Sequence, residues 1–330
     1  MTFEERVEAM VDHGFTERQA GFLTTVMLHA GVCLGRQYCA YAGIVRGQKM
    51  HDFFRELVKN GFATVSSSAH RKTHLYHVHA KTLYRTIGEP NNRHRRPVPL
   101  SRAIERLMVL DGVLADRRHR WLATEREKVA HFTRVTRLSR SDLPFISFGV
   151  KPEETVRYFA EKLPIGVDPD GRRHVFVFLV THRLPIDFRA FLHRYGNLLR
   201  TLPAWTVRLL IPPHLAGAIT LYEAAARDEL GTPLRPATVD ELRWYFAQRR
   251  DAATDPTILD DPPRYQRACA MFGAPRFRVL YRMWQRYGDW VLNATTSPVT
   301  ADALARRTGQ VNCHVLAHTY QHLSTLVSTS

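Results

Sequence analysis

Hydrogen-bond donors gather on one side of a predicted helix in the first quarter of the chain. Within residues 43–62, GIVRGQKMHDFFRELVKNGF, apolar residues recur at the spacing of a single helix face: Met50, Phe53, Phe54, Leu57 and Val58. The opposite side is polar and carries Gln48, Lys49, His51, Asp52 and Arg55. Amide, ammonium, imidazole and guanidinium groups can donate to base edges or phosphates. The pattern therefore predicts a helix that either contacts DNA or presents an ordinary solvated face.

Further donors extend this candidate surface in both directions along the chain. Arg36 and Gln37 open the preceding predicted helix, where backbone amides and side chains often contact phosphate. A basic turn at residues 70–73 is placed to meet a neighbouring phosphate or the minor groove. We predict the following DNA-binding residues: Arg36, Gln37, Arg46, Gln48, Lys49, His51, Arg55, His70, Arg71, Lys72 and Thr73. One alternative stays open, because Asp52 and Arg55 are three residues apart on a helix and could pair with each other.

Two carboxylates in the middle of the chain could bind a divalent metal ion. Asp168 and Asp170 belong to the sequence DPDG, and cations such as Mg²⁺ require clustered carboxylates. The strand predicted after them offers no further acidic residue and no lysine in residues 178–182, FLVTH. The residues of DPDG also suit a type I turn. We therefore expect a turn here, and we expect no metal, no cofactor and no enzymatic activity.

Three predicted helices and two strands position the candidate DNA-binding residues. Thr16 and Gln19 fit a capping box for a helix that ends at Gly31, and residues 35–43 and 47–60 predict the next two helices. Residues 62–81 then predict a strand, a turn and a second strand. The side chains expected to close a small core beneath these elements are Phe22, Leu23, Val26, Tyr38, Ile44, Phe53, Phe54, Leu57 and Phe62.

The order of these elements resembles the winged helix-turn-helix domain of bacterial regulators. The run KMHDFFRELVKNGFATVSS, followed by HLYHVH, is similar to the recognition helix and wing of those proteins. The resemblance implies that the third helix lies in the major groove of double-stranded DNA. It also implies a sequence-specific transcriptional regulator that acts as a homodimer on two half-sites.

A looser resemblance is to replication-relaxation-type proteins of mobile elements, which join a winged helix to a restriction-endonuclease-like domain. The matching features are a Pro-Asp-Gly turn at residues 169–171, the strand VFVFLVT, Tyr195 within a helix, and the strand WTVRLLI. The resemblance implies a mobile-element or plasmid setting. In nucleases of that fold, an acidic residue of the turn and an Asp/Glu-x-Lys on the next strand hold the metal. This chain departs from that pattern because it lacks the Asp/Glu-x-Lys.

The rest of the chain divides into three further predicted regions. Residues 91–141 predict an exposed linker, with the basic run Asn92–Arg96, and then a long helical pattern that breaks at residues 116–121. Residues 142–215 predict an α/β unit, in which two apolar strands flank a helix. Residues 216–330 predict a helical region. Together with a winged helix-turn-helix at residues 1–90, these regions predict a mainly helical α+β protein.

The composition is that of a globular protein with a polyanionic partner. The chain has 330 residues and a formal net charge of +16, which favours nucleic acid as the partner. No apolar run is long enough to cross a bilayer, and the N-terminus does not resemble a secretory signal. We therefore expect no membrane contact and a cytoplasmic, nucleoid-associated protein. The four cysteines form no CxxC pair, so we expect buried thiols rather than a zinc finger.

Three hypotheses for the function follow from these observations. The first is a dimeric, sequence-specific regulator that dimerises through its middle or C-terminal part. The alternative is a metal-dependent nuclease or nicking accessory in plasmid replication or transfer, which would use Asp168 and Asp170. A third is a protein-interaction module whose interface lies near Trp244, Trp284 and Trp290. RNA also stays open as the partner, because a basic surface does not distinguish between nucleic acids.

Overall fold

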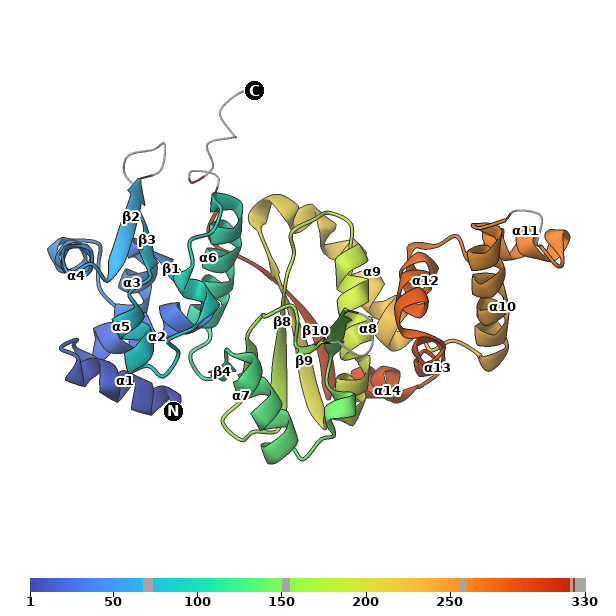
Figure 1. The fold of residues 1–330 in the computed structure, drawn as a ribbon, viewed down its shortest axis with the longest axis horizontal. Helices are drawn as coiled ribbons and strands as arrows, with labels where there is room; N and C mark the ends of the chain where they lie inside the picture. The colour runs from blue at the N-terminus through green and yellow to red at the C-terminus, as the bar shows by residue number, and fades with distance from the viewer. Residues whose placement is uncertain (68–73, 150–154, 256–258, 321–322, 324–330) are drawn as a thin grey trace, which may run out of the picture.

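The computed structural model describes residues 1–67, 74–149, 155–255, 259–320 and 323. The chain is an α+β protein whose elements form three groups arranged in a row (Figure 1). Helices with a small sheet lie at one end, a five-stranded sheet covered by helices lies in the middle, and further helices lie at the other end. The expected α+β class is confirmed.

Local capping signals start and end the helices of the first group. These helices are α1 (Phe3–Asp12), α2 (Glu17–His29), α3 (Gly35–Ala42), α4 (Gln48–Lys59) and α5 (Lys81–Thr86). α2 begins at Thr16, which forms the predicted capping box with Gln19. α3 ends at Gly43, whose φ of 63° is a conformation that glycine adopts without steric cost. The sequence predicts α2, α3 and α4, and it misses α1 and α5.

A three-stranded antiparallel sheet completes the first group. Its strands are β1 (Val32–Leu34), β2 (Ala63–Ser67) and β3 (His74–Val78), in the order β1-β3-β2. Tyr76 of β3 lies opposite Val65 on one side and Cys33 on the other. The pairing of β2 with β3 confirms the predicted two-stranded ribbon, and β1 adds a strand that the sequence did not indicate. The predicted basic tip at residues 70–73 lies outside the described residues.

The first core is the buried cluster beneath α2, α3, α4 and this sheet. Most of the side chains predicted for it are buried, namely Phe22, Leu23, Val26, Tyr38, Phe53, Phe54 and Leu57. Ile44 and Phe62 are half-buried at its edge. The ring of Phe54 stacks on that of Tyr76 with a centroid distance of 4.0 Å, which joins α4 to β3. Because burying such a side chain contributes ~1.5–3 kcal/mol, the apolar face of α4 fixes which side of the helix faces solvent.

The middle group is built on a mixed five-stranded sheet. Its strands are β4 (Arg120–Leu122), β7 (Ile165–Val167), β8 (Arg173–Leu179), β9 (Ala204–Ile211) and β10 (Gly309–Val315), in the order β10-β9-β8-β7-β4. β8, β9 and β10 run parallel, whereas β7 and β4 are antiparallel to their neighbours. α8 (Ile186–Thr201) connects β8 to β9. The predicted strand–helix–strand unit is confirmed.

Alternate residues of β8 face two different helices. Phe176 and Phe178 pack in a second core with α8, whereas Val177 and Leu179 pack in the first core with α6 (Leu100–Ala115). α6 thus lies between the first group and the sheet (Figure 1). A methyl group on Gly112 of α6 would come within 2.5 Å of the Leu210 side chain, so this glycine allows the close approach of α6 to β9.

Two predicted regions contain strands that the sequence did not indicate. Residues 91–141 are not an exposed linker throughout, because His94 is buried, and they contain the predicted long helix, α6, together with β4 of the central sheet. Residues 216–330 are mainly helical, as predicted, but they also contain β10, which pairs with β9. β4 has only three residues and β10 alternates with polar residues, so both strands depend on pairing with distant partners.

Short elements connect the larger ones, and the helices of the last group enclose a third core. The 3₁₀ turn Arg93–Arg95 packs against α2. The other short elements are α7 (Glu125–Ala130), the π-helical turn His131–Val135, the 3₁₀ turns Arg140–Asp142 and Pro213–Ala218, β5 (Phe145–Phe148), β6 (Thr155–Tyr158), α9 (Ile219–Ala226) and the π-helical turn Arg227–Gly231. The last group contains α10 (Pro236–Ala252), α11 (Pro262–Met271), α12 (Pro275–Tyr287), α13 (Trp290–Ala294) and α14 (Val299–Ala305). Within the described residues, no helix is both long enough and apolar enough to span a bilayer.

The chain returns to the first core after β10. Leu316, Tyr320 and Leu323 are buried in that core, far in sequence from its other members. The end of the described chain therefore packs against α6 and the first group (Figure 1).

The four cysteines differ in exposure. Cys33 and Cys39 are buried, as predicted, and burial raises the pKa of the Cys33 thiol. Cys269 is exposed, so the prediction of buried thiols is wrong for this residue. Cys313 is half-buried.

Candidate nucleic-acid interface

The side of α4 that faces solvent is set by its start and by its apolar face. Gly47 precedes the helix in an extended conformation and has no side chain to cap it. Met50, Phe53, Phe54 and Leu57 are buried. The residues that remain exposed include all the predicted DNA contacts of this segment, namely Arg46, Gln48, Lys49, His51 and Arg55. We call these five residues the α4 surface.

The outermost line of the α4 surface is internally paired. Successive residues of a helix are ~100° apart, so Gln48, Asp52 and Arg55 lie on the same outer side. The amide Nε2 of Gln48 donates to Asp52 Oδ1 at 2.7 Å, and the guanidinium of Arg55 pairs with the same carboxylate. The alternative in which Asp52 and Arg55 pair is confirmed. Part of the positive charge predicted for DNA contact is thus neutralised on the helix itself.

The flank of α4 that faces β3 is basic. A hollow of about 90 Å³ lies between α3, α4 and β3, and its lining includes Arg46, His51 and His74. Arg46 and His51 belong to the predicted set. His74 does not, because the predicted contacts of the ribbon were confined to its turn and His74 lies on the strand that follows. The period-2 pattern of that strand places His74 and Tyr76 on the same side and is the signal that could have identified it.

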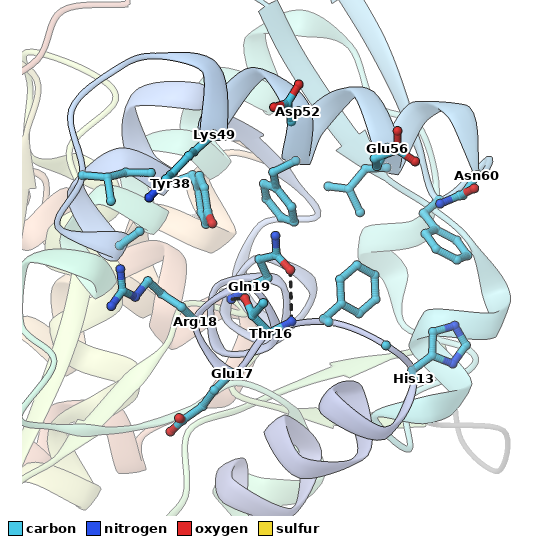
Figure 2. A pocket seen from close by; sticks show the side chains of 17 residues that line it. His13, Thr16, Glu17, Arg18, Gln19, Tyr38, Lys49, Asp52, Glu56 and Asn60 are labelled. Carbon is cyan, nitrogen blue, oxygen red and sulfur yellow. Dashed lines mark hydrogen bonds between the residues drawn. The ribbon is translucent and has the colours of Figure 1, made fainter.

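The opposite flank of α4 has mixed charge. A groove of about 840 Å³ lies between α4 and the start of α2. Lys49, Asp52 and Glu56 belong to its α4 side (Figure 2). Glu17 and Arg18 lie across the groove at the start of α2. Lys49 therefore lies beside a groove whose lining also includes acidic residues, whereas Arg46 and His51 lie on the basic flank. The structure thus separates predicted contacts that the sequence placed together.

Gln37 must be removed from the candidate interface. Its side chain is 1% exposed. The amide Nε2 donates to Asp111 Oδ1 at 2.7 Å and to the Leu107 carbonyl at 3.1 Å, and its Oε1 accepts from the Leu34 amide at 2.9 Å. Since all its hydrogen-bonding groups are used inside the protein, Gln37 holds α3 against α6 and does not reach DNA.

Arg36 also has an internal partner. Its guanidinium donates to both oxygens of Asp111, at 3.0 and 2.7 Å, and to the hydroxyl of Tyr320 at 2.9 Å. The Tyr320 hydroxyl in turn donates to Asp111, and burial together with this carboxylate raises the pKa of Tyr320. Paired in this bidentate way, Arg36 fixes α3 to α6 and to the returning chain. Arg36 therefore has a structural role, but its side chain is 29% exposed and lines the same hollow as Arg46, so its assignment as a DNA contact stays a prediction.

Four predicted contacts cannot be placed. His70, Arg71, Lys72 and Thr73 lie outside the described residues.

The candidate metal ligands form a turn. Asp168 Oδ1 accepts from the Arg173 amide at 2.9 Å, and Asp170 Oδ1 accepts from the Arg172 amide at 2.9 Å. The Gly171 amide also donates to the Asp168 carbonyl at 3.0 Å, which closes the turn between β7 and β8. In the part of the chain that the structure describes, no group of three or more His, Cys, Asp or Glu side chains could hold a metal ion.

No family model, curated protein sequence or solved structure matches this chain. The case for a function therefore rests on the geometry of its own residues.

Proposed function

We propose that the protein is a sequence-specific double-stranded DNA-binding protein and a transcriptional regulator. The observation that carries the proposal is the position of α4, whose exposed polar side is presented to solvent by a fully packed apolar side. The formal net charge of +16 supports a polyanionic partner.

We propose further that residues 1–90 act as a winged helix-turn-helix domain. The order α2, β1, α3, α4, β2, β3 and the sheet order β1-β3-β2 support this assignment. In this arrangement α4 enters the major groove, and the ribbon β2–β3 lies beside it as the wing. Phe54 and Tyr76, stacked at 4.0 Å, fix the wing relative to α4.

The basic flank supplies the principal contacts in this proposal. Arg46, His51 and His74 line one hollow, so a phosphate or a base edge placed there meets donors from both the helix and the strand. Gln48 and Arg55 form the outer line of the helix, where Asp52 fixes their orientation. Lys49 contributes less, because its groove contains Asp52, Glu56 and Glu17.

We propose a homodimer, since two half-sites about 34 Å apart give a single winged helix the phosphate contacts it otherwise lacks. The middle or C-terminal part of the chain would form the dimer contact. A cytoplasmic, nucleoid-associated location and an origin in a mobile element or plasmid complete the proposal. Light scattering of the purified protein, with and without DNA, measures its molar mass and thus tests whether it is a homodimer.

Fluorescence anisotropy with labelled duplexes tests the proposal. The duplexes are random fragments and the region upstream of the protein's own gene, each measured at two salt concentrations with and without Mg²⁺. We expect a salt-sensitive complex that prefers one fragment, and we expect Arg46→Ala and His51→Ala to weaken it. Arg85→Ala, an exposed arginine on α5, is the matched control. Absence of a complex with every duplex would overturn the proposal.

Denaturing gel electrophoresis of the same DNA samples tests the nuclease alternative. Cut or nicked DNA that appears only with Mg²⁺, and that disappears in Asp170→Ala, would replace the regulator with an enzyme that uses Asp168 and Asp170.

A further inference from the structure

A second cluster of basic side chains lines a cleft that shares no residue with α4. The cleft has a volume of about 610 Å³ and lies between residues 93–109, which include the first part of α6, and residues 160–163. Its cationic residues are Arg93, Arg102, Arg106 and Lys162. We call it the α6 cleft. Arg93 comes from the basic run that the sequence suggested was a linker.

The carboxylates of the α6 cleft are already paired with other cations. Glu105 pairs with Arg102 of its own helix, and Glu161 pairs with Arg194 of α8 at 2.6 Å. Glu161 also accepts from the hydroxyl of Tyr195. These partners leave little negative charge to balance the remaining cations of the cleft.

Arg93, Arg106 and Lys162 have no ion pair within 4 Å among the residues that the structure describes. Each guanidinium is anchored by one carbonyl: Arg93 donates to that of Lys162 at 3.0 Å, and Arg106 to that of Ala30 at 3.4 Å. A guanidinium has five N–H donors, so most of them stay available for a ligand. Desolvation, followed by the like charges of Arg106 and Arg102, lowers the pKa of Arg93 to about 10.

The N-terminus of α6 opens into the same cleft. Pro99, Ser101 and Arg102 line it, and no side chain caps this end of the helix. The amides of the first turn and the positive end of the helix dipole favour an anion there. Two independent features, the unpaired cations and an uncapped sixteen-residue helix, therefore face one space.

We propose that the α6 cleft binds the phosphate groups of an anionic ligand. Guanidinium groups bind phosphate through paired N–H donors. A bound phosphate would therefore be the anionic partner that Arg93, Arg106 and Lys162 do not have among the described residues. Since Arg106 belongs to α6 and Lys162 to the middle group, a bound phosphate connects the first group to the central sheet. The phosphate comes either from a free phosphorylated molecule or from the backbone of nucleic acid. The proposal does not depend on DNA binding by α4.

Calorimetric titration of the full-length protein with inorganic pyrophosphate at low salt tests the proposal. We expect saturable binding that Arg106→Gln and Arg93→Gln each weaken at least about tenfold, because each removes charge-assisted hydrogen bonds. The control is Arg282→Gln, an exposed arginine on α12, which should bind like the wild type. Absence of binding in the wild type and unchanged DNA affinity in both cleft variants would together overturn the proposal.

Thermal unfolding separates a ligand site from a structural role. Removing one of several crowded cations relieves repulsion, so Arg106→Gln should raise the melting temperature of the ligand-free protein and abolish the increase caused by pyrophosphate. A melting temperature lowered by Arg106→Gln, with the pyrophosphate effect retained, would contradict the proposal.

DNA binding by the same variants identifies the source of the phosphate. If the ligand is a free molecule, Arg106→Gln loses pyrophosphate binding and keeps its DNA affinity. If the ligand is the DNA backbone, Arg106→Gln weakens all duplexes alike and lowers the slope of affinity against salt by about one. If Arg106→Gln loses pyrophosphate binding and its DNA binding does not differ from that of the wild type, the result supports the phosphate site. That conclusion holds even if α4 does not bind DNA.

Discussion

The α4 surface and the α6 cleft are both rich in cations, but they differ in what surrounds those cations. On α4, Asp52 pairs with Arg55 and accepts from Gln48, and Lys49 faces a groove with further carboxylates. In the cleft, both lining carboxylates pair with other arginines, which leaves Arg93 and Arg106 without an ion pair among the described residues. The density of basic residues in a segment is thus a poor guide to the positive charge available to a ligand. The positive charge available to a ligand depends on which carboxylates pair with these basic residues, and the fold determines those pairs.

A half-buried ion pair between α3 and α6 should have the largest effect on stability. Asp111 accepts from Arg36, Gln37 and Tyr320, so Asp111→Ala leaves three groups without their acceptor. We expect a loss of about 3 kcal/mol in the free energy of unfolding, measured by urea denaturation. Asp52→Ala, which breaks an exposed pair, should cost less than about 1 kcal/mol. Equal losses in the two variants would show that burial does not distinguish these pairs.

Lowering the pH should reduce the free energy of unfolding through buried histidines, one of which lines the α6 cleft. Burial lowers the pKa of His29, which lines the cleft, to about 4, against about 6.5 in the unfolded chain. Between these values the unfolded chain binds a proton that the folded protein excludes, so stability falls as the pH falls. Each such histidine removes about 1.4 kcal/mol per pH unit. His131 and His174, in contact at 2.8 Å and each with a pKa of about 4, act in the same direction as a pair.

The measurement is the free energy of unfolding between pH 6.5 and pH 5, above the range in which ordinary carboxylates titrate. His29→Gln should lose about 2 kcal/mol less than the wild type over this interval. Parallel curves for the two proteins would show that His29 is not held neutral by the fold.

Within the α4 surface, the two flanks should respond differently to substitution. Arg46→Ala should weaken DNA binding by about 1 to 2 kcal/mol, because Arg46 lies on the basic flank with His51 and His74. Lys49→Ala should weaken it by about half as much, since Asp52 and Glu56 already oppose its charge. Anisotropy titrations at two salt concentrations measure both. A larger loss for Lys49→Ala would place the DNA on the other flank.

The smallest predicted effect has the opposite sign. Asp52→Asn removes a carboxylate from the outer line of α4 and frees Arg55. DNA binding should tighten by about 1 kcal/mol or less, with a steeper dependence on salt. Weaker binding in this variant would indicate that Asp52 is needed to orient Gln48 and Arg55.

The elements that the sequence predicted are those with local signals. The capping box at Thr16, the left-handed glycine at Gly43 and the apolar face of α4 each lie within a few residues of the structure they specify. The pairing of Asp52 with Arg55 is local too, and it was foreseen as an alternative. The parallel strands around α8 are mainly apolar and mostly buried, because both of their faces are covered.

What the sequence did not indicate depends on partners far along the chain. The strand β10, GQVNCHV, alternates with polar residues and becomes a strand only beside β9. The residue type of Gln37 and its position at a helix start suggested a phosphate contact. Its amide instead donates to Asp111, which is 74 residues away in the sequence. The α6 cleft needs Arg93 from a turn and Arg106 from a helix to line one space. No local pattern specifies any of these three contacts.

The contact between Arg36 and Tyr320 can form only late in protein synthesis. The two residues are 284 positions apart, and a ribosome adds roughly 5 to 20 residues per second. Arg36 and Asp111 are therefore outside the ribosome for tens of seconds before the tyrosine that shares their hydrogen bonds exists. During that interval the site that Tyr320 will fill is open on the nascent chain, and the helices proposed to contact DNA fold before the segment that completes their core.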